Sequence, residues 1–114
     1  MDTTDFVTVQ TTTDSAGEAE QLAALAVERR LAACVQVSEV RSYYWWQGET
    51  HSDPEFLLTL KTTSGAVPAI KELLGSQHSY DEPELIVQPI VDGSDTYLEW
   101  IAQCTELSSP GTPG

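Results

Sequence analysis

The chain has 114 residues, 40% of them hydrophobic, and its 18 acidic side chains against 5 basic ones give a formal net charge of −13. This size and composition predict one folded domain. So acidic a surface repels phosphate backbones and anionic lipid headgroups, so we expect neither nucleic acid nor membrane as a partner. It attracts cations, although acidity as an aid to solubility or an adaptation to salt explains the charge equally well.

The beginning of the chain and its cysteines bear on the compartment. The first ten residues have neither a basic nor an apolar segment, and no later apolar run approaches the length of a membrane span. Cys34 and Cys104 lie far apart and lack the CxxC spacing of a zinc ribbon. We therefore expect a cytoplasmic protein with two reduced thiols.

The first predicted elements are a strand at 5–13, where apolar and polar residues alternate, and a helix after it. Ser15 and Glu18 have the spacing of a capping box, in which each would bond the backbone amide of the other. Arg29 and Arg30 follow at the predicted end of this helix, where the unpaired carbonyl groups favour positive charge. The apolar stripe of this helix is formed by Ala19, Leu22, Ala23 and Ala26.

A long hairpin comes next. β-Branched and aromatic residues are frequent in 34–46 and again in 49–62, and only a glutamine and a glycine separate the two segments. Gly48 supplies the positive φ that a two-residue turn needs, so these segments are predicted to pair in an antiparallel hairpin. Pro54 lacks a backbone N–H and should mark a bulge or an edge position.

The remaining elements are a helix at 66–78, a strand at 84–90 and a short helix after Ser94. Pro89 indicates that the strand lies at an edge of the sheet. The apolar positions of the two helices are Val67, Ile70 and Leu74 in the first and Tyr97, Leu98 and Ile101 in the second. Residues 1–107 are predicted to form the single domain and residues 108–114 a flexible tail.

The order of elements is β-α-β-β-α-β with a terminal helix, the split β-α-β arrangement of ferredoxin-like folds, and the predicted class is α+β. The hairpin is longer than a small four-stranded sheet needs, so about half of it should project. Its end would expose four adjacent rings, which another copy of the chain is expected to cover. The predicted interface residues are Tyr43, Tyr44, Trp45 and Trp46.

Five segments together resemble the CutA divalent-cation tolerance proteins. They are RLAACVQV at 30–37, YYWWQGE at 43–49, LTLKTT at 58–63, HSYDEPE at 78–84 and PIVDGSDTYLEWI at 89–101. The resemblance implies a homotrimer in which each hairpin extends across its neighbours, and a function in tolerance of copper and other divalent ions. The family usually has Asn at Gln36, and proline and glutamate at Ser79 and Asp81, so this chain differs close to His78.

The densest group of possible metal ligands follows the second helix. His78 stands near Asp81, Glu82 and Glu84, which offer imidazole and carboxylate donors. The spacing matches no closed metal site, and a structural histidine beside an acidic loop is the alternative. Cys34 is a further candidate, although a small buried thiol on a strand is the simpler interpretation. We predict weak binding of divalent cations, copper above all, by His78, Glu82, Glu84 and Cys34.

The resemblance also implies that Lys61, Tyr80 and Trp100 border a cleft between subunits. A trimeric sensor of the PII-like kind, with a small anionic ligand in that cleft, is therefore the alternative function. An ion-paired Lys61 and a core Trp100 are the simpler interpretations of these two residues. His51 should lie opposite Tyr44 as a surface residue of the hairpin.

Catalysis has little support in the sequence. No Ser-His-Asp or Cys-His arrangement is evident, and no glycine-rich phosphate loop follows a strand. An acylphosphatase shares the topology but needs an arginine after the first strand, where this chain has none. We expect a protein that is not an enzyme.

Overall fold

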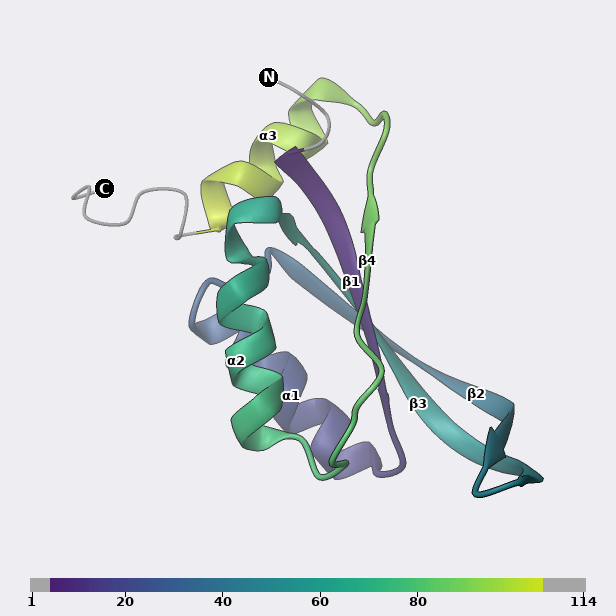
Figure 1. Cartoon of the computed structure of the whole chain (residues 1–114). Helices are drawn as coiled ribbons and strands as arrows, with labels where there is room; N and C mark the ends of the chain where they lie inside the picture. The colour runs from purple at the N-terminus through teal and green to yellow at the C-terminus, as the bar shows by residue number, and fades with distance from the viewer. Residues whose placement is uncertain (1–4, 106–114) are drawn as a thin grey trace.

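The computed structural model describes residues 5–105 as a four-stranded sheet with helices (Figure 1). All strand pairs are antiparallel, in the order β2-β3-β1-β4. The elements are β1 (Phe6–Thr13), α1 (Ala16–Glu28), β2 (Cys34–Trp46), β3 (Glu49–Thr63), the 3-10 turn η2 (Ser64–Ala66), α2 (Val67–Gln77), β4 (Ile86–Pro89) and α3 (Asp95–Cys104). The α+β ferredoxin-like prediction is confirmed, whereas the domain end at 107 and the tail at 108–114 lie outside the described residues.

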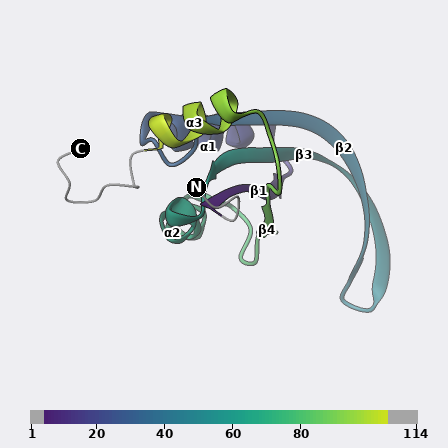
Figure 2. The same ribbon diagram turned by 90° about the horizontal axis from the view of Figure 1, so that it is seen from above.

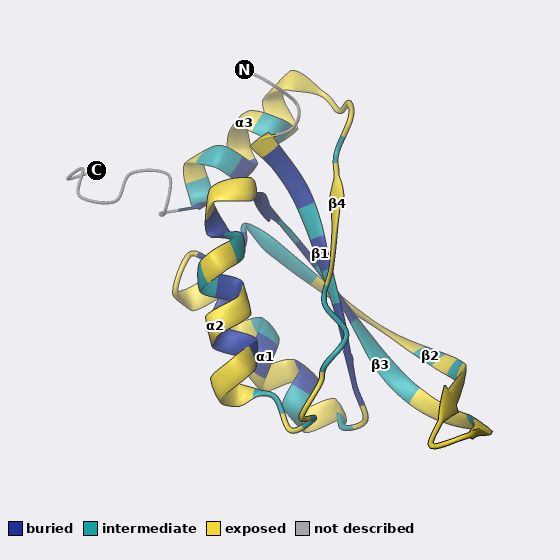
Figure 3. Cartoon of the chain, in the orientation of Figure 1, coloured by how far each residue is buried: buried dark blue, intermediate teal, exposed yellow. Residues whose placement is uncertain are grey.

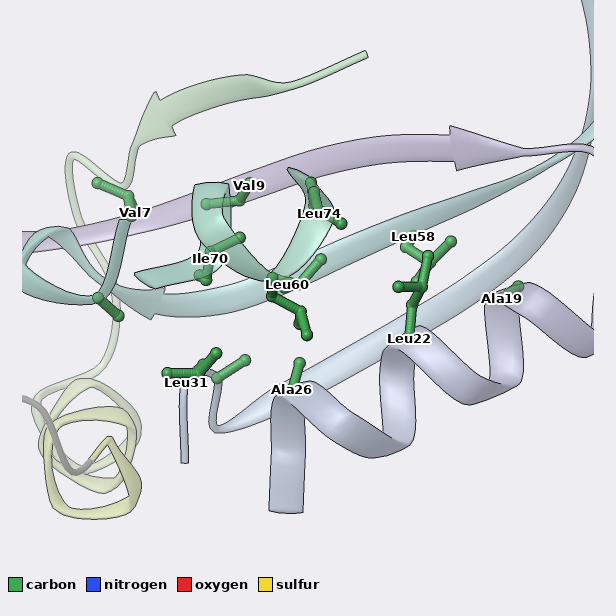
Figure 4. Packing of buried hydrophobic residues seen from close by; sticks show 13 residues of the cluster. Val7, Val9, Ala19, Leu22, Ala26, Leu31, Leu58, Leu60, Ile70 and Leu74 are labelled. Atoms are coloured by element: carbon green, nitrogen blue, oxygen red, sulfur yellow. The ribbon is translucent and has the colours of Figure 1, made fainter. Parts of the chain in front are cut away.

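One face of the sheet packs against α1 and α2. Val9 pairs with Leu60, so both side chains point to this face and are buried. The helices supply the apolar positions predicted from their 3.6-residue spacing. Figure 4 shows how these side chains pack: Leu22 and Ala26 from α1, Ile70 and Leu74 from α2, Leu58 and Leu60 from β3.

Helix α3 lies at the other face, at the end where β3 finishes. Phe6 and Ile101 are buried but do not belong to the core cluster under α1 and α2. Successive side chains of a strand point to opposite faces of the sheet, so Phe6 points away from the face on which Val7 is buried under α1 and α2. Lys61, on the same face as Phe6, contacts α3 through a hydrogen bond. Trp100 is 39% exposed, so the simpler interpretation of this residue as part of the core does not hold for the single chain.

The start of α1 differs in part from the predicted capping box. Ser15 Oγ accepts the N–H of Glu18 at 3.2 Å, as predicted. The Glu18 carboxylate, however, accepts the N–H of Ser79 at 2.8 Å instead of returning to Ser15. The chain after α2 packs against the start of α1, and this brings the Ser79 N–H within reach of Glu18.

The arginine after α1 serves another helix. Arg30 has a positive φ of 59°, which turns the chain immediately after the helix. Its guanidinium donates to the carbonyl oxygens of Gln103 at 3.0 Å and Cys104 at 3.3 Å. The positive charge therefore caps the last carbonyls of α3, where the helix dipole favours it.

The hairpin keeps one register from its base to its tip. Gln47 and Gly48 both have positive φ, as a two-residue turn of type I′ requires. Pro54 lies opposite Arg41 without a bulge, beyond the last residue of β3 that pairs with β1. Of the two predictions for this proline, the edge position is confirmed and the bulge is wrong.

Candidate functional site

The end of the hairpin leaves the body of the subunit. Pairing of β1 with β3 stops at Phe56, whereas β2 and β3 stay paired as far as the turn. We call residues 40–55 the ribbon. Figures 1 and 2 show it curving away from the helices, and Figure 3 shows its end largely exposed. The predicted projection of about half of the hairpin is therefore confirmed.

The four adjacent rings of the ribbon divide between its two faces. Side chains alternate along β2, so Tyr43 and Trp45 point to one face and Tyr44 and Trp46 to the other. Tyr43 is 77% exposed and Trp45 75%, and the other two rings are also exposed. A neighbour on one face alone leaves two aromatic side chains in water. Burial of the whole tip requires contacts on both faces.

Polar contacts hold the second of these faces in place. Tyr44 and His51 lie opposite one another, as predicted, and their rings stack with centroids 5.6 Å apart. The Tyr44 hydroxyl donates a hydrogen bond to the Asp53 carboxylate. That bond to an anion raises the pKa of Tyr44, because the phenolate would lose it.

His78 has a fully buried side chain and uses both of its ring nitrogens. The backbone N–H of Tyr80 donates to Nδ1 at 3.0 Å, so Nδ1 is the acceptor. Nε2 therefore carries the proton and donates to the carbonyl oxygen of Thr12 at 2.8 Å. A neutral histidine of this tautomer connects the loop after α2 to β1. These contacts favour the structural alternative, and a metal role for His78 stays a prediction.

Glu18 lies next to this histidine. Its carboxylate is 3.4 Å from Nδ1 of His78 and accepts the N–H of Ser79. Burial alone raises the pKa of Glu18, but the hydrogen bonds from Ser79 outweigh this effect, and the net pKa is lowered. The carboxylate is thus stabilised in its charged form.

The predicted metal ligands do not meet within one chain. Glu82 is exposed, while Glu84 accepts a hydrogen bond from Gln10 at 3.3 Å. Cys34 pairs across the sheet with Lys61, which also pairs with Thr8 of β1, about 13 Å along that strand from the Thr12 carbonyl that binds His78. Among residues 5–105, no three His, Cys, Asp or Glu side chains form a group that could hold a metal ion. The roles predicted for these four residues remain untested.

The predicted cleft residues lie at two ends of the subunit. Lys61 Nζ is 3.3 Å from the Tyr97 hydroxyl and 5.5 Å from the centroid of that ring, which in turn packs on Trp100. The Tyr80 hydroxyl instead donates to Glu55 at 2.9 Å, six residues along β3 from Lys61, or about 20 Å. A cleft that contains all three predicted residues must therefore combine two subunits.

Sequence reasoning missed two contacts of these residues. Tyr97 precedes Trp100 by three positions on a helix, a spacing that places two rings side by side and could have indicated the pair. The second contact is the hydrogen bond from the Tyr80 hydroxyl to Glu55. No sequence spacing could have indicated it, because the two residues are brought together only by the fold.

Comparison with known proteins gives consistent matches. The family model described as CutA1 divalent ion tolerance protein matches residues 7–104. Protein CutA of Mus musculus is 42% identical over 96 residues, which are 82% of this chain and 54% of the mouse protein. The divalent-cation tolerance protein CutA of Thermus thermophilus is 44% identical over 88 residues, covering 76% of this chain and 85% of that protein. The chain spans about half the length of the mouse and human relatives.

Solved structures show the same fold. The structure of CutA from Synechococcus elongatus has a TM-score of 0.88 and 36% sequence identity, covering 93% of this chain and 95% of that one.

Among residues 5–105, no helix has the length and apolar character needed to cross a membrane.

Proposed function

The chain belongs to the CutA1 divalent ion tolerance family, and from this premise we propose that it is a homotrimer that binds divalent cations and catalyses no reaction. The homotrimer is implied by the resemblance of five segments of the chain to this family. A cytoplasmic location stays a prediction from the sequence.

The observation that carries the assembly is the aromatic end of the ribbon. Trp45 and Tyr43 are about three-quarters exposed in the single chain, and the rings lie on both faces of a two-stranded ribbon. Such a ribbon is marginal in water by itself, and an exposed apolar patch of this kind marks an interface. In a ring of three subunits, each ribbon can extend across its neighbours, which covers both faces.

The cation function rests on the family and on the charge of −13. We propose weak copper binding by the Glu82 and Glu84 carboxylates and the Cys34 thiol; the Glu84 carboxylate retains lone pairs beside the hydrogen bond that it accepts from Gln10. Each provides a single donor in one chain, so neighbouring subunits or water must complete the coordination. His78 joins such a site only if it gives up the Tyr80 N–H, since both of its nitrogens are engaged.

The alternative sensor function has less support. Lys61 already contacts the Tyr97 hydroxyl and ring, whereas Tyr80 contacts Glu55 in the middle of the same strand, six residues away. A small anionic ligand also meets the repulsion of a strongly acidic protein.

Two measurements test the proposal. Light scattering at micromolar concentration should give the mass of three chains, and a monomer would refute the assembly. Calorimetric titration with copper in 0.5 M NaCl, where nonspecific attraction is screened to about 4 to 5 Å, should show binding that weakens in Cys34→Ser or Glu82→Gln. A parent protein that takes up no copper under these conditions would refute the cation function.

A further inference from the structure

The segment between α2 and β4 is attached to three different elements of the subunit. We call residues 78–84 the strap, which crosses the bottom of the molecule in Figure 1. Its contacts with α1, β1 and β3 are Ser79 N–H to Glu18, His78 to the Thr12 carbonyl, Gln10 to Glu84, and Tyr80 to Glu55. The segment has no regular secondary structure, so these contacts hold it in place.

One of these contacts reaches the base of the ribbon. Glu55 precedes Phe56, the last residue of β3 that pairs with β1. Its Oε2 accepts the Tyr80 hydroxyl at 2.9 Å, and its Oε1 accepts the Ser42 hydroxyl of β2 at 2.6 Å. One carboxylate thus joins both strands of the ribbon to the strap.

The hydroxyl of Tyr80 is suited to a lasting contact. Partial burial and the neighbouring Glu55 raise the pKa of Tyr80, so the phenol keeps its proton and its donor role throughout the neutral range. The tyrosine ring also packs against the buried His78 ring, with centroids 4.9 Å apart. The strap therefore has a fixed end at His78 from which Tyr80 extends to Glu55.

We infer that the strap sets the angle at which the ribbon leaves the subunit, through the bond from Tyr80 to Glu55. Beyond Phe56 the ribbon has no third strand, and two-stranded ribbons twist and bend more freely than a sheet. This inference rests on the proposed homotrimer, because the angle matters only if the aromatic end must meet a neighbour. The strap then prepares the ribbon for assembly, which lowers the ordering cost of association.

The test removes one oxygen atom. In Tyr80→Phe the ring stays and the bond to Glu55 is lost. Hydrogen exchange of the backbone amides of residues 53 and 55–57 should become about tenfold faster, and subunit exchange between labelled and unlabelled trimers should accelerate by a similar factor. Tyr97→Phe is the matched control, since it removes a hydroxyl that bonds Lys61, six residues further along β3 than Glu55. It should leave exchange at 53–57 unchanged.

The outcomes separate the strap from the assembly. Exchange at 53–57 that is equal in Tyr80→Phe and in the parent would overturn the inference, whatever the oligomeric state. Equal acceleration in both tyrosine variants would also overturn it, because the effect would then not depend on the strap. A monomeric parent with faster exchange only in Tyr80→Phe would refute the proposed homotrimer and leave the bond between strap and ribbon in place.

Discussion

Replacing Trp45 by alanine should weaken assembly strongly while leaving the fold of each subunit intact. The side chain is 75% exposed in the single chain and lies near the tip of the ribbon, outside the core cluster. It makes no contribution to the packing of α1 and α2 on the sheet. Any large effect of its removal must therefore come from contacts with other chains.

The exposed area sets the size of the effect. A tryptophan side chain buries roughly 200 Å², so about 150 Å² remains to be covered, worth about 4 kcal/mol per subunit at 25 cal/mol per Å². The alanine side chain retains a small part of this burial energy. The free energy of association should therefore weaken by about 3 kcal/mol per subunit and about 9 kcal/mol per trimer. The half-dissociation concentration varies as the square root of the trimer dissociation constant, so it should rise about a thousandfold or more.

Sedimentation equilibrium across a dilution series measures this concentration directly. Val27→Ala is the control, since Val27 is also exposed but belongs to α1. The control should dissociate like the parent, and circular dichroism should show unchanged secondary structure in both variants. A Trp45→Ala trimer whose half-dissociation concentration rises less than tenfold would show that the rings of the ribbon are not the principal contact.

Three further predictions concern the body of the subunit. His78→Ala should lower the free energy of unfolding by about 2 to 4 kcal/mol, measured by urea titration, because the Thr12 carbonyl and Tyr80 N–H lose a buried partner. Its copper affinity in 0.5 M NaCl should change less than about threefold, and a larger fall would make the imidazole a ligand after all. Because the pKa of Glu18 is lowered on folding, its stabilising effect is complete above its unfolded value and is lost as the pH falls through the folded value. Stability should therefore decline less steeply below about pH 4.5 in Glu18→Gln, and a parallel decline would contradict this. Arg30→Ala should lower the unfolding free energy by about 1 kcal/mol and speed hydrogen exchange in the last turn of α3, while unchanged exchange there would rule out the cap.

Local chemistry made much of the fold predictable from the sequence. The positive φ required at Gly48 located the turn of the hairpin, and the hydroxyl of Ser15 located the start of α1. The length of 34–46 and 49–62 indicated a ribbon longer than its sheet, with four adjacent rings near its end. These signals act between residues that are close in the chain, so a single sequence contains them.

The contacts at the candidate site depend on the tertiary structure. His78 and Glu84 are close in sequence to other carboxylates, which suggested a ligand cluster, yet the fold directs His78 to the carbonyl of Thr12, 66 positions away. Arg30 likewise finds its acceptor at Cys104, 74 positions away, although the end of α1 is adjacent. Each partner is brought within reach only when the helices pack on the sheet. A buried polar group must bond whatever donor or acceptor that packing supplies, so its role is decided by the tertiary structure and not by its neighbours in the chain.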